Sequence, residues 1–203
     1  MTRRRVRVGT QSPPGLPAAV APAFAHPELL TAHAVARHYV GDLVYGANDG
    51  LITTFAVVAG VAGAALSTRV VVILGCANLL ADGFSMAASN FLAIRSRGAV
   101  EVAERRAVTE PFAARHALAT FLAFVIAGAV PLLAFFAGVP EQDRFVTATA
   151  LTLVTLFAVG AARTAVTQGR WWTNGLEMLG VGALAAAVAY AIGRLLSTVT
   201  GVG

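Results

Sequence analysis

Four acidic residues lie within or at the edge of stretches of the chain that are otherwise apolar: Asp42, Asp49, Asp82 and Glu177. Ionisable groups in such stretches are costly to bury, and they commonly mark the path of an ion or a proton. Asp42 and Asp49 are seven residues apart, so a helix carries both on one face. At a rise of 1.5 Å per residue, Asp49 lies about 10 Å deeper than Asp42. The spacing predicts a row of carboxylates along one helix.

A methionine in the next apolar stretch adds a second kind of ligand. That stretch runs in the opposite direction and ends near Arg95, nine residues after Met86, which places Met86 about 13 Å deep and near the level of Asp49. Asp82 lies one turn beyond Met86 on the same face. A thioether beside carboxylates favours softer cations such as ferrous iron over magnesium or calcium. Because carboxylates also carry protons, the set predicts exchange of a metal ion for protons.

Each of these residues also has an ordinary structural interpretation. Met86 is of a type that usually fills space in a core. Asp42 could cap a helix at the membrane interface, and Glu177 could do the same for the last apolar stretch. Asp82, next to Gly83, could serve a helix bend. Asp49 is the hardest to explain in this way, because it lies too deep for a short side chain to reach water.

The remaining polar residues do not form a catalytic pattern. All four histidines lie outside the apolar stretches, and His33 and His38 are five residues apart, which is unsuitable for a two-histidine metal site on one helix. The chain contains no nucleophile-elbow, zinc-protease or phosphate-loop motif. We therefore predict that the protein is not an enzyme and holds no permanently bound cofactor.

The elements that must position the carboxylates are predicted to be membrane-spanning helices. Hydrophobic residues make up 57% of the chain and charged residues only 12%, with a mean hydropathy of +0.73. A spanning helix needs about 20 apolar residues. Five stretches qualify, which predicts an all-α integral membrane protein with five transmembrane helices, and Pro131 is expected to kink the third. The predicted spans are 42–66, 70–94, 117–138, 145–167 and 174–196.

The distribution of arginine predicts the orientation. All fifteen basic residues are arginine, and with the N-terminus in the cytoplasm twelve of them lie inside and three (Arg69, Arg144 and Arg194) outside. Five spans then place the C-terminus outside. The basic residues at the span ends favour a lipid bilayer over nucleic acid as partner. The all-arginine set indicates a bacterial plasma membrane from a GC-rich genome.

Outside the spans, three segments have recognisable compositions. Residues 1–26 are predicted to be a disordered basic tail rich in proline and alanine, ahead of a transmembrane domain over 27–203. Residues 27–40 are weakly amphipathic and could form a short interfacial helix. Residues 95–116 form the only sizeable predicted cytoplasmic loop. Its Glu101 and Glu104 are spaced as neighbours on a helix and are candidate metal ligands.

Small residues in the first span indicate close helix contacts. Gly46 and Gly50, and Gly60 and Ala64, are each four residues apart, a spacing that lets backbones approach. Such a contact between two copies of the chain would bring two Asp49 residues near a symmetry axis.

Several of these segments together resemble one family. GDLVYGANDGLITTFAVVAGVAGA (41–64) and ANLLADGFSMAASNFLAIRS (77–96) resemble the first two helices of the vacuolar iron transporter family, which includes yeast and plant importers of iron into vacuoles. Residues 117–133 and 174–193 resemble its third and fifth helices. The resemblance implies a homodimer of five-helix protomers that exports ferrous iron, and often manganese, from the cytosol in exchange for protons. It assigns metal-binding roles to Asp42, Asp49 and Met86.

The chain departs from the family pattern in two places. Ser89-Asn90 replaces a Gly-Glu pair that many relatives carry, and the long Glu- and Met-rich insert of relatives is reduced to 95–116, with three glutamates and no methionine. Glu101 and Glu104 are a possible remnant of that insert, or alternatively solvated residues paired with nearby arginines. A membrane scaffold without transport activity, or a transporter of another cation, remains the alternative function.

Overall fold

The computed structural model describes residues 32–106, 108–164 and 169–201, and within these ranges every regular element is a helix. The predicted all-α class is therefore confirmed. The predicted tail over 1–26 lies outside the described residues. The helices are α1 (Ala32–Gly63), α2 (Thr68–Ala103), α3 (Ala113–Gly128), α4 (Val130–Phe136), α5 (Glu141–Ala162) and α7 (Trp171–Thr200).

Four of these helices are long and apolar enough to cross a membrane: α1 from His38 onward, α2, α5 and α7. The pair α3 and α4 passes the same test as one bent span, which brings the number to as many as five. The break lies where the sequence predicted it, because Pro131 stands in the first turn of α4 and has no N–H to continue the α3 hydrogen-bond ladder. The two segments meet at a bend of 43°.

The helices extend beyond several of the predicted spans. α2 continues to Ala103, so the first part of the 95–116 segment is helix rather than loop. α1 already runs from Ala32, so the described part of the predicted interfacial helix is continuous with the first span. Hydropathy marks where a helix enters lipid, whereas alanine, arginine and glutamate continue a helix into water.

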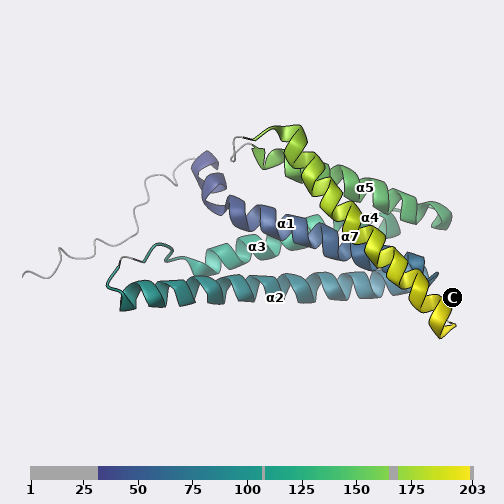
Figure 1. The fold of residues 1–203 in the computed structure, drawn as a ribbon, viewed down its shortest axis with the longest axis horizontal. Coiled ribbons are helices and arrows are strands. Elements are labelled where there is room, and N and C mark those ends of the chain that lie inside the picture. The colour runs from purple at the N-terminus through teal and green to yellow at the C-terminus, as the bar shows by residue number, and fades with distance from the viewer. Residues whose placement is uncertain (1–31, 107, 165–168, 202–203) are drawn as a thin grey trace, which may run out of the picture.

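α1 is the central helix of the bundle, with α2 and α3 on one side and α5 and α7 on the other (Figure 1). Two glycines allow the close approach of its neighbours. A Cβ added to Gly50 would lie 2.3 Å from the carbonyl oxygen of Phe124 on α3, and one added to Gly63 would lie 2.3 Å from that of Tyr190 on α7. The small-residue faces of α1 are thus used for contacts within this chain.

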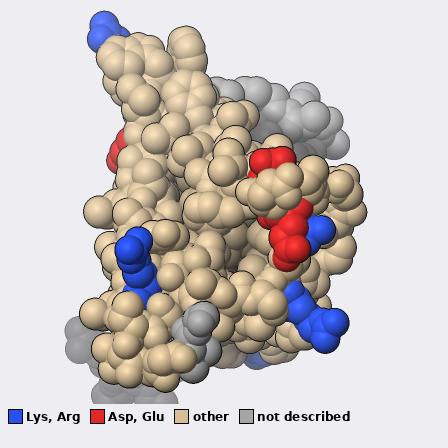
Figure 2. All heavy atoms as spheres, turned by 90° about the vertical axis from the view of Figure 1, so that its right-hand side faces the viewer, with Lys and Arg blue, Asp and Glu red and all other residues tan. Residues whose placement is uncertain are grey.

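The core lies where these helices meet, and the outer surface is apolar. Phe55, Val58 and Phe124 are buried in the main cluster. In contrast, Phe84 on α2 is 71% exposed and Val154 on α5 is 69% exposed, as lipid-facing side chains are. The end of the molecule at the right of Figure 1, seen face-on in Figure 2, shows only a few charged groups on an otherwise uncharged surface. An apolar surface around an apolar core, together with the helix lengths, fits an integral membrane protein.

Candidate functional site

Asp42 lies at a junction of three helices. Its side chain is only 15% exposed. Asn90 Nδ2 on α2 donates a hydrogen bond to Asp42 Oδ1 at 2.7 Å, and the same amide group donates to Thr120 Oγ1 on α3 at 2.8 Å. Nδ1 of His116, also on α3, lies 2.5 Å from Asp42 Oδ2. Since α1 begins at least ten residues earlier, the alternative that Asp42 caps a helix is wrong.

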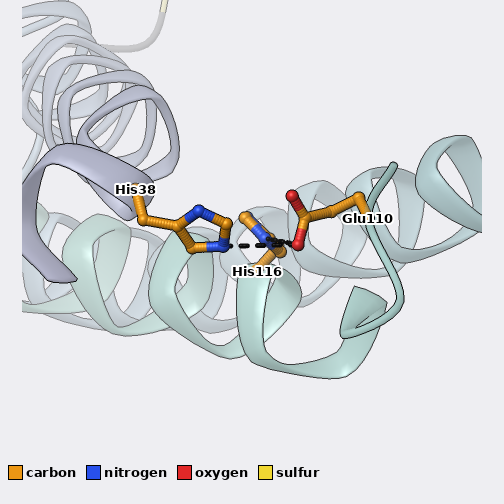
Figure 3. Close-up of side chains that lie close together, drawn as sticks. All are labelled: His38, Glu110 and His116. Atoms are coloured by element: carbon orange, nitrogen blue, oxygen red, sulfur yellow. Dashed lines mark ion pairs between the residues drawn. The ribbon is translucent and has the colours of Figure 1, made fainter. Parts of the chain in front are cut away.

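Next to Asp42, two histidines converge on one glutamate (Figure 3). His38 comes from α1, Glu110 from the segment before α3, and His116 from the first turn of α3. Glu110 Oε1 lies 3.3 Å from His38 Nε2 and 3.0 Å from His116 Nε2. The three ligand atoms lie within 4.8 Å of one another, a spacing that could hold a metal ion. We refer to His38, Glu110 and His116 as the histidine cluster.

The histidine cluster borders a cavity of about 350 Å³, which Asp42 and Asn90 also line. Glu101 lines the same cavity and accepts hydrogen bonds from the backbone N–H and the hydroxyl of Thr109, at 2.8 Å and 2.6 Å. Glu101 therefore fastens the segment that carries Glu110 onto α2. Glu104 lies outside this cavity, exposed and paired with Arg106.

Asp49 lies deeper in the bundle, in different surroundings. Its carboxylate and that of Asp82 on α2 are close enough for their charges to interact. Among the residues that the structure describes, no side chain donates a hydrogen bond to the Asp49 carboxylate, and Thr53 bonds only to its backbone carbonyl, at 2.8 Å. Two partly buried carboxylates repel each other unless a cation binds them or one of them takes up a proton.

The register of α1 and α2 follows from the contact between Asp42 and Asn90. Because the two helices form an antiparallel hairpin, seven residues further along α1 corresponds to seven residues back along α2, so Asp49 lies level with Gly83 and next to Asp82. Met86 lies about one turn nearer to Asp42 than the sequence-based depth estimate placed it. Its side chain is partly buried and packs against the main core cluster.

Glu177 lies on α7, apart from the other acidic residues. It is the seventh residue of a helix that begins at Trp171, so the alternative of a capping role is wrong for this residue as well. Arg163 donates to Glu177 Oε2 at 2.9 Å. Both residues line a second cavity of about 350 Å³ between α1 and α7, together with Asn48.

Comparison with known proteins identifies the family. The model of the VIT family matches residues 40–115 and 107–194, which is most of the chain. This protein belongs to the VIT family. The match covers both aspartates of α1 and every residue of the histidine cluster except His38.

Three curated relatives of this VIT-family protein come from plants. Vacuolar iron transporter homolog 5 of Oryza sativa subsp. japonica is 34% identical over 138 residues, which cover 63% of this chain and 65% of the relative. Vacuolar iron transporter homolog 3 of Arabidopsis thaliana is 31% identical over 167 residues, covering 76% and 82%. Vacuolar iron transporter 1 of O. sativa subsp. japonica is 25% identical over 230 residues, covering 85% and 90%. All three are named as transporters, in agreement with the prediction that this chain is not an enzyme.

The histidine cluster is the part of this VIT-family protein that the sequence prediction missed. In the sequence, His38 and His116 lie outside the apolar stretches and form no recognisable metal-binding pattern. One signal was available: His38 stands four residues before Asp42, so the two share a helix face. The approach of Glu110 and His116 had no such signal, since it depends on how α3 packs against α1.

Proposed function

We propose that this protein exports ferrous iron or manganese from the cytosol in exchange for protons. The observation that carries the proposal is the pair Asp49 and Asp82. These two carboxylates are close enough for electrostatic repulsion and lie in the apolar part of the bundle. A divalent cation relieves their repulsion when it binds, and protons do the same when it leaves. One pair of groups can therefore hold either substrate in turn, which is the physical requirement for exchange.

The proposed entry to this pair is the end of the molecule that carries the histidine cluster. The cation would reach the cavity bordered by Asp42, lose part of its water there, and move two helical turns along α1 to Asp49. By the register, Met86 lies between these two levels. Its thioether would favour ferrous iron over harder cations along the way. Glu177 and its cavity would form a further part of the path or of the proton route.

The direction of transport rests on the arginine distribution. The twelve-to-three excess supports a cytoplasmic position for the histidine-cluster end, and entry of the cation at that end would make the transport an export from the cytosol. The composition favours a bacterial plasma membrane. The names of the plant relatives support iron as the substrate.

The family resemblance also implies a homodimer. Since the Gly46 and Gly50 side of α1 packs against α3 within the protomer, a second copy has to use another surface. Molecular mass measurement of the protein in nanodiscs tests this part of the proposal.

The experiment uses full-length protein in liposomes that contain a metal-sensitive dye and a proton-sensitive dye. Addition of Fe²⁺ or Mn²⁺ is expected to produce metal flux with opposite proton flux. Asp49→Asn is expected to abolish both signals. Asp143→Asn, a matched change in the exposed first turn of α5, is expected to leave both unchanged.

The outcomes separate the proposal from its alternatives. Absence of any coupled flux in the unaltered protein would favour a membrane scaffold. Flux of an organic cation that metal ions do not inhibit would favour a different substrate. Equal flux in Asp49→Asn and in the unaltered protein would remove the Asp49 and Asp82 pair from the mechanism.

A further inference from the structure

We propose that the histidine cluster is a second metal site, which binds a divalent transition-metal ion through His38 Nε2, Glu110 Oε1 and His116 Nε2. It borders the cavity beside Asp42, nearer to the start of α1 than Asp49. Asp42 serves this site as a positioning residue for His116. The inference goes beyond the transport proposal, because binding at the cluster is measurable whether or not the protein moves ions.

The distances within the cluster suit a shared ion. Histidine nitrogen and carboxylate oxygen bind such ions at about 2.0–2.2 Å. Two ligands at that distance, separated by tetrahedral or octahedral angles, lie about 2.8–3.6 Å apart. Glu110 Oε1 lies 3.3 Å from one Nε2 atom and 3.0 Å from the other, inside this interval. Both glutamate–histidine pairs thus already have the separation that a shared ion requires, and the two Nε2 atoms lie within 4.8 Å of each other.

The protonation of His116 favours a ligand role. Its Nδ1 faces the Asp42 carboxylate at 2.5 Å, and a carboxylate can only accept, so Nδ1 carries a proton. In the neutral ring, Nε2 then presents a lone pair toward Glu110 Oε1, which is also an acceptor. Two acceptors 3.0 Å apart require either a proton or a metal ion between them. A carboxylate behind a histidine ligand is a recurrent arrangement in metal sites, because it orients the ring and strengthens its basicity.

Because His116 Nε2 is buried, a hydrogen bond to solvent water does not readily satisfy it. The His116 side chain is 8% exposed, and its Nε2 atom is buried and forms no hydrogen bond. A buried polar atom without a hydrogen bond is destabilising unless something else satisfies it. A second proton on His116 is the competing explanation. The convergence of His38 on the same glutamate oxygen favours a metal ion, because one oxygen then serves two imidazoles around a common centre.

The ligand set also restricts the class of ion. Two imidazoles and one carboxylate suit Zn²⁺, Fe²⁺ and Co²⁺, whereas Mg²⁺ and Ca²⁺ prefer oxygen ligands throughout. Three protein ligands leave at least one coordination position open, and the cavity beside the cluster gives that position access to incoming ions. Binding would also tie the segment carrying Glu110 to α1.

The test measures Co²⁺ binding to the full-length protein in nanodiscs, by visible absorption and by calorimetry. We expect His38→Gln and Glu110→Gln each to remove one binding site per chain. Asp42→Asn is expected to weaken that site by about 10- to 100-fold while the fold remains intact. Glu141→Gln, a matched change at the far end of the molecule, is the control and is expected to bind as the unaltered protein does.

Two further results decide between explanations. Asp49→Asn is expected to keep the imidazole-type Co²⁺ spectrum although its flux is lost, so failure of transport and failure of this site are distinguishable. Identical Co²⁺ affinity and stoichiometry in His38→Gln, Glu110→Gln and the unaltered protein would overturn the proposal. Absence of Co²⁺ binding at millimolar concentration would also overturn it, and would assign a proton to the cluster instead.

Discussion

Asp42 and Asp49 are the same residue type on the same face of one helix, yet their surroundings differ. Asp42 is bonded by Asn90 and faces His116, so its charge is stabilised by groups of the protein itself. Asp49 has no side-chain donor among the described residues and faces a second carboxylate instead. The comparison indicates that Asp42 positions other groups, whereas Asp49 has a charge that only a cation or a proton from outside can neutralise.

The largest effect is expected from a change at Asp49, the deeper of the two aspartates. Asp49→Ala should abolish protection of cells against excess iron, because the repelling pair that holds the cation is lost. Growth of an iron-sensitive host at rising iron concentration measures this, with expression checked in the membrane fraction. Full protection by Asp49→Ala would show that Asp49 does not lie on the path.

The next effect concerns Asp42. Asp42→Asn should lower metal flux in liposomes by about ten-fold, because the amide no longer orients His116 as a carboxylate does. The loss should appear mainly as a higher half-saturating metal concentration, since the deeper pair remains. A complete loss of flux at saturating metal would instead make Asp42 equivalent to Asp49, and the contrast between them would fail.

A smaller effect tests whether protein donors stabilise Asp42. Asn90→Ala removes the amide that bonds both Asp42 and Thr120, and it should lower the free energy of unfolding by about 1 kcal/mol. Denaturant titration in detergent measures the change. In the double variant with Asp42→Asn, the two losses should not add, because the residues share one interaction. Additive losses would contradict the assigned contact.

The smallest effect concerns Met86, which lies between the two aspartates by register. Met86→Leu keeps the side-chain volume and its place against the core cluster, but it removes the sulfur. We expect about a two-fold loss in the preference for Fe²⁺ over Mg²⁺ in competition flux assays, with total flux little changed. An unaltered preference would assign Met86 to packing alone.

Much of the fold could be predicted from local sequence features. Apolar runs of spanning length indicated α1, α2, α5 and α7, and Pro131 indicated the break between α3 and α4. Both are local properties, because every backbone polar group in lipid must be satisfied within its own helix. Helix ends were less accurate, as for α2, because residues beyond the apolar run continue the helix into water.

In the candidate site, too, some features could be predicted from the sequence and others required the tertiary structure. The spacing of Asp42 and Asp49 on one helix face, and the presence of Asp82 in the next span, came from the sequence by itself, since they depend only on helical periodicity. The tertiary structure decided what each carboxylate faces. It placed Asp82, rather than Met86, level with Asp49.

The histidine cluster depended entirely on tertiary structure. His116 is 74 residues from Asp42, and Asn90 is 48 residues from it. The contact of His116 with Asp42 requires α1 to lie close to the backbone of α3, which Gly46 and Gly50 allow because they have no side chains. No local pattern encodes that approach, so only the packed structure shows that two histidines outside the apolar stretches meet one glutamate beside Asp42.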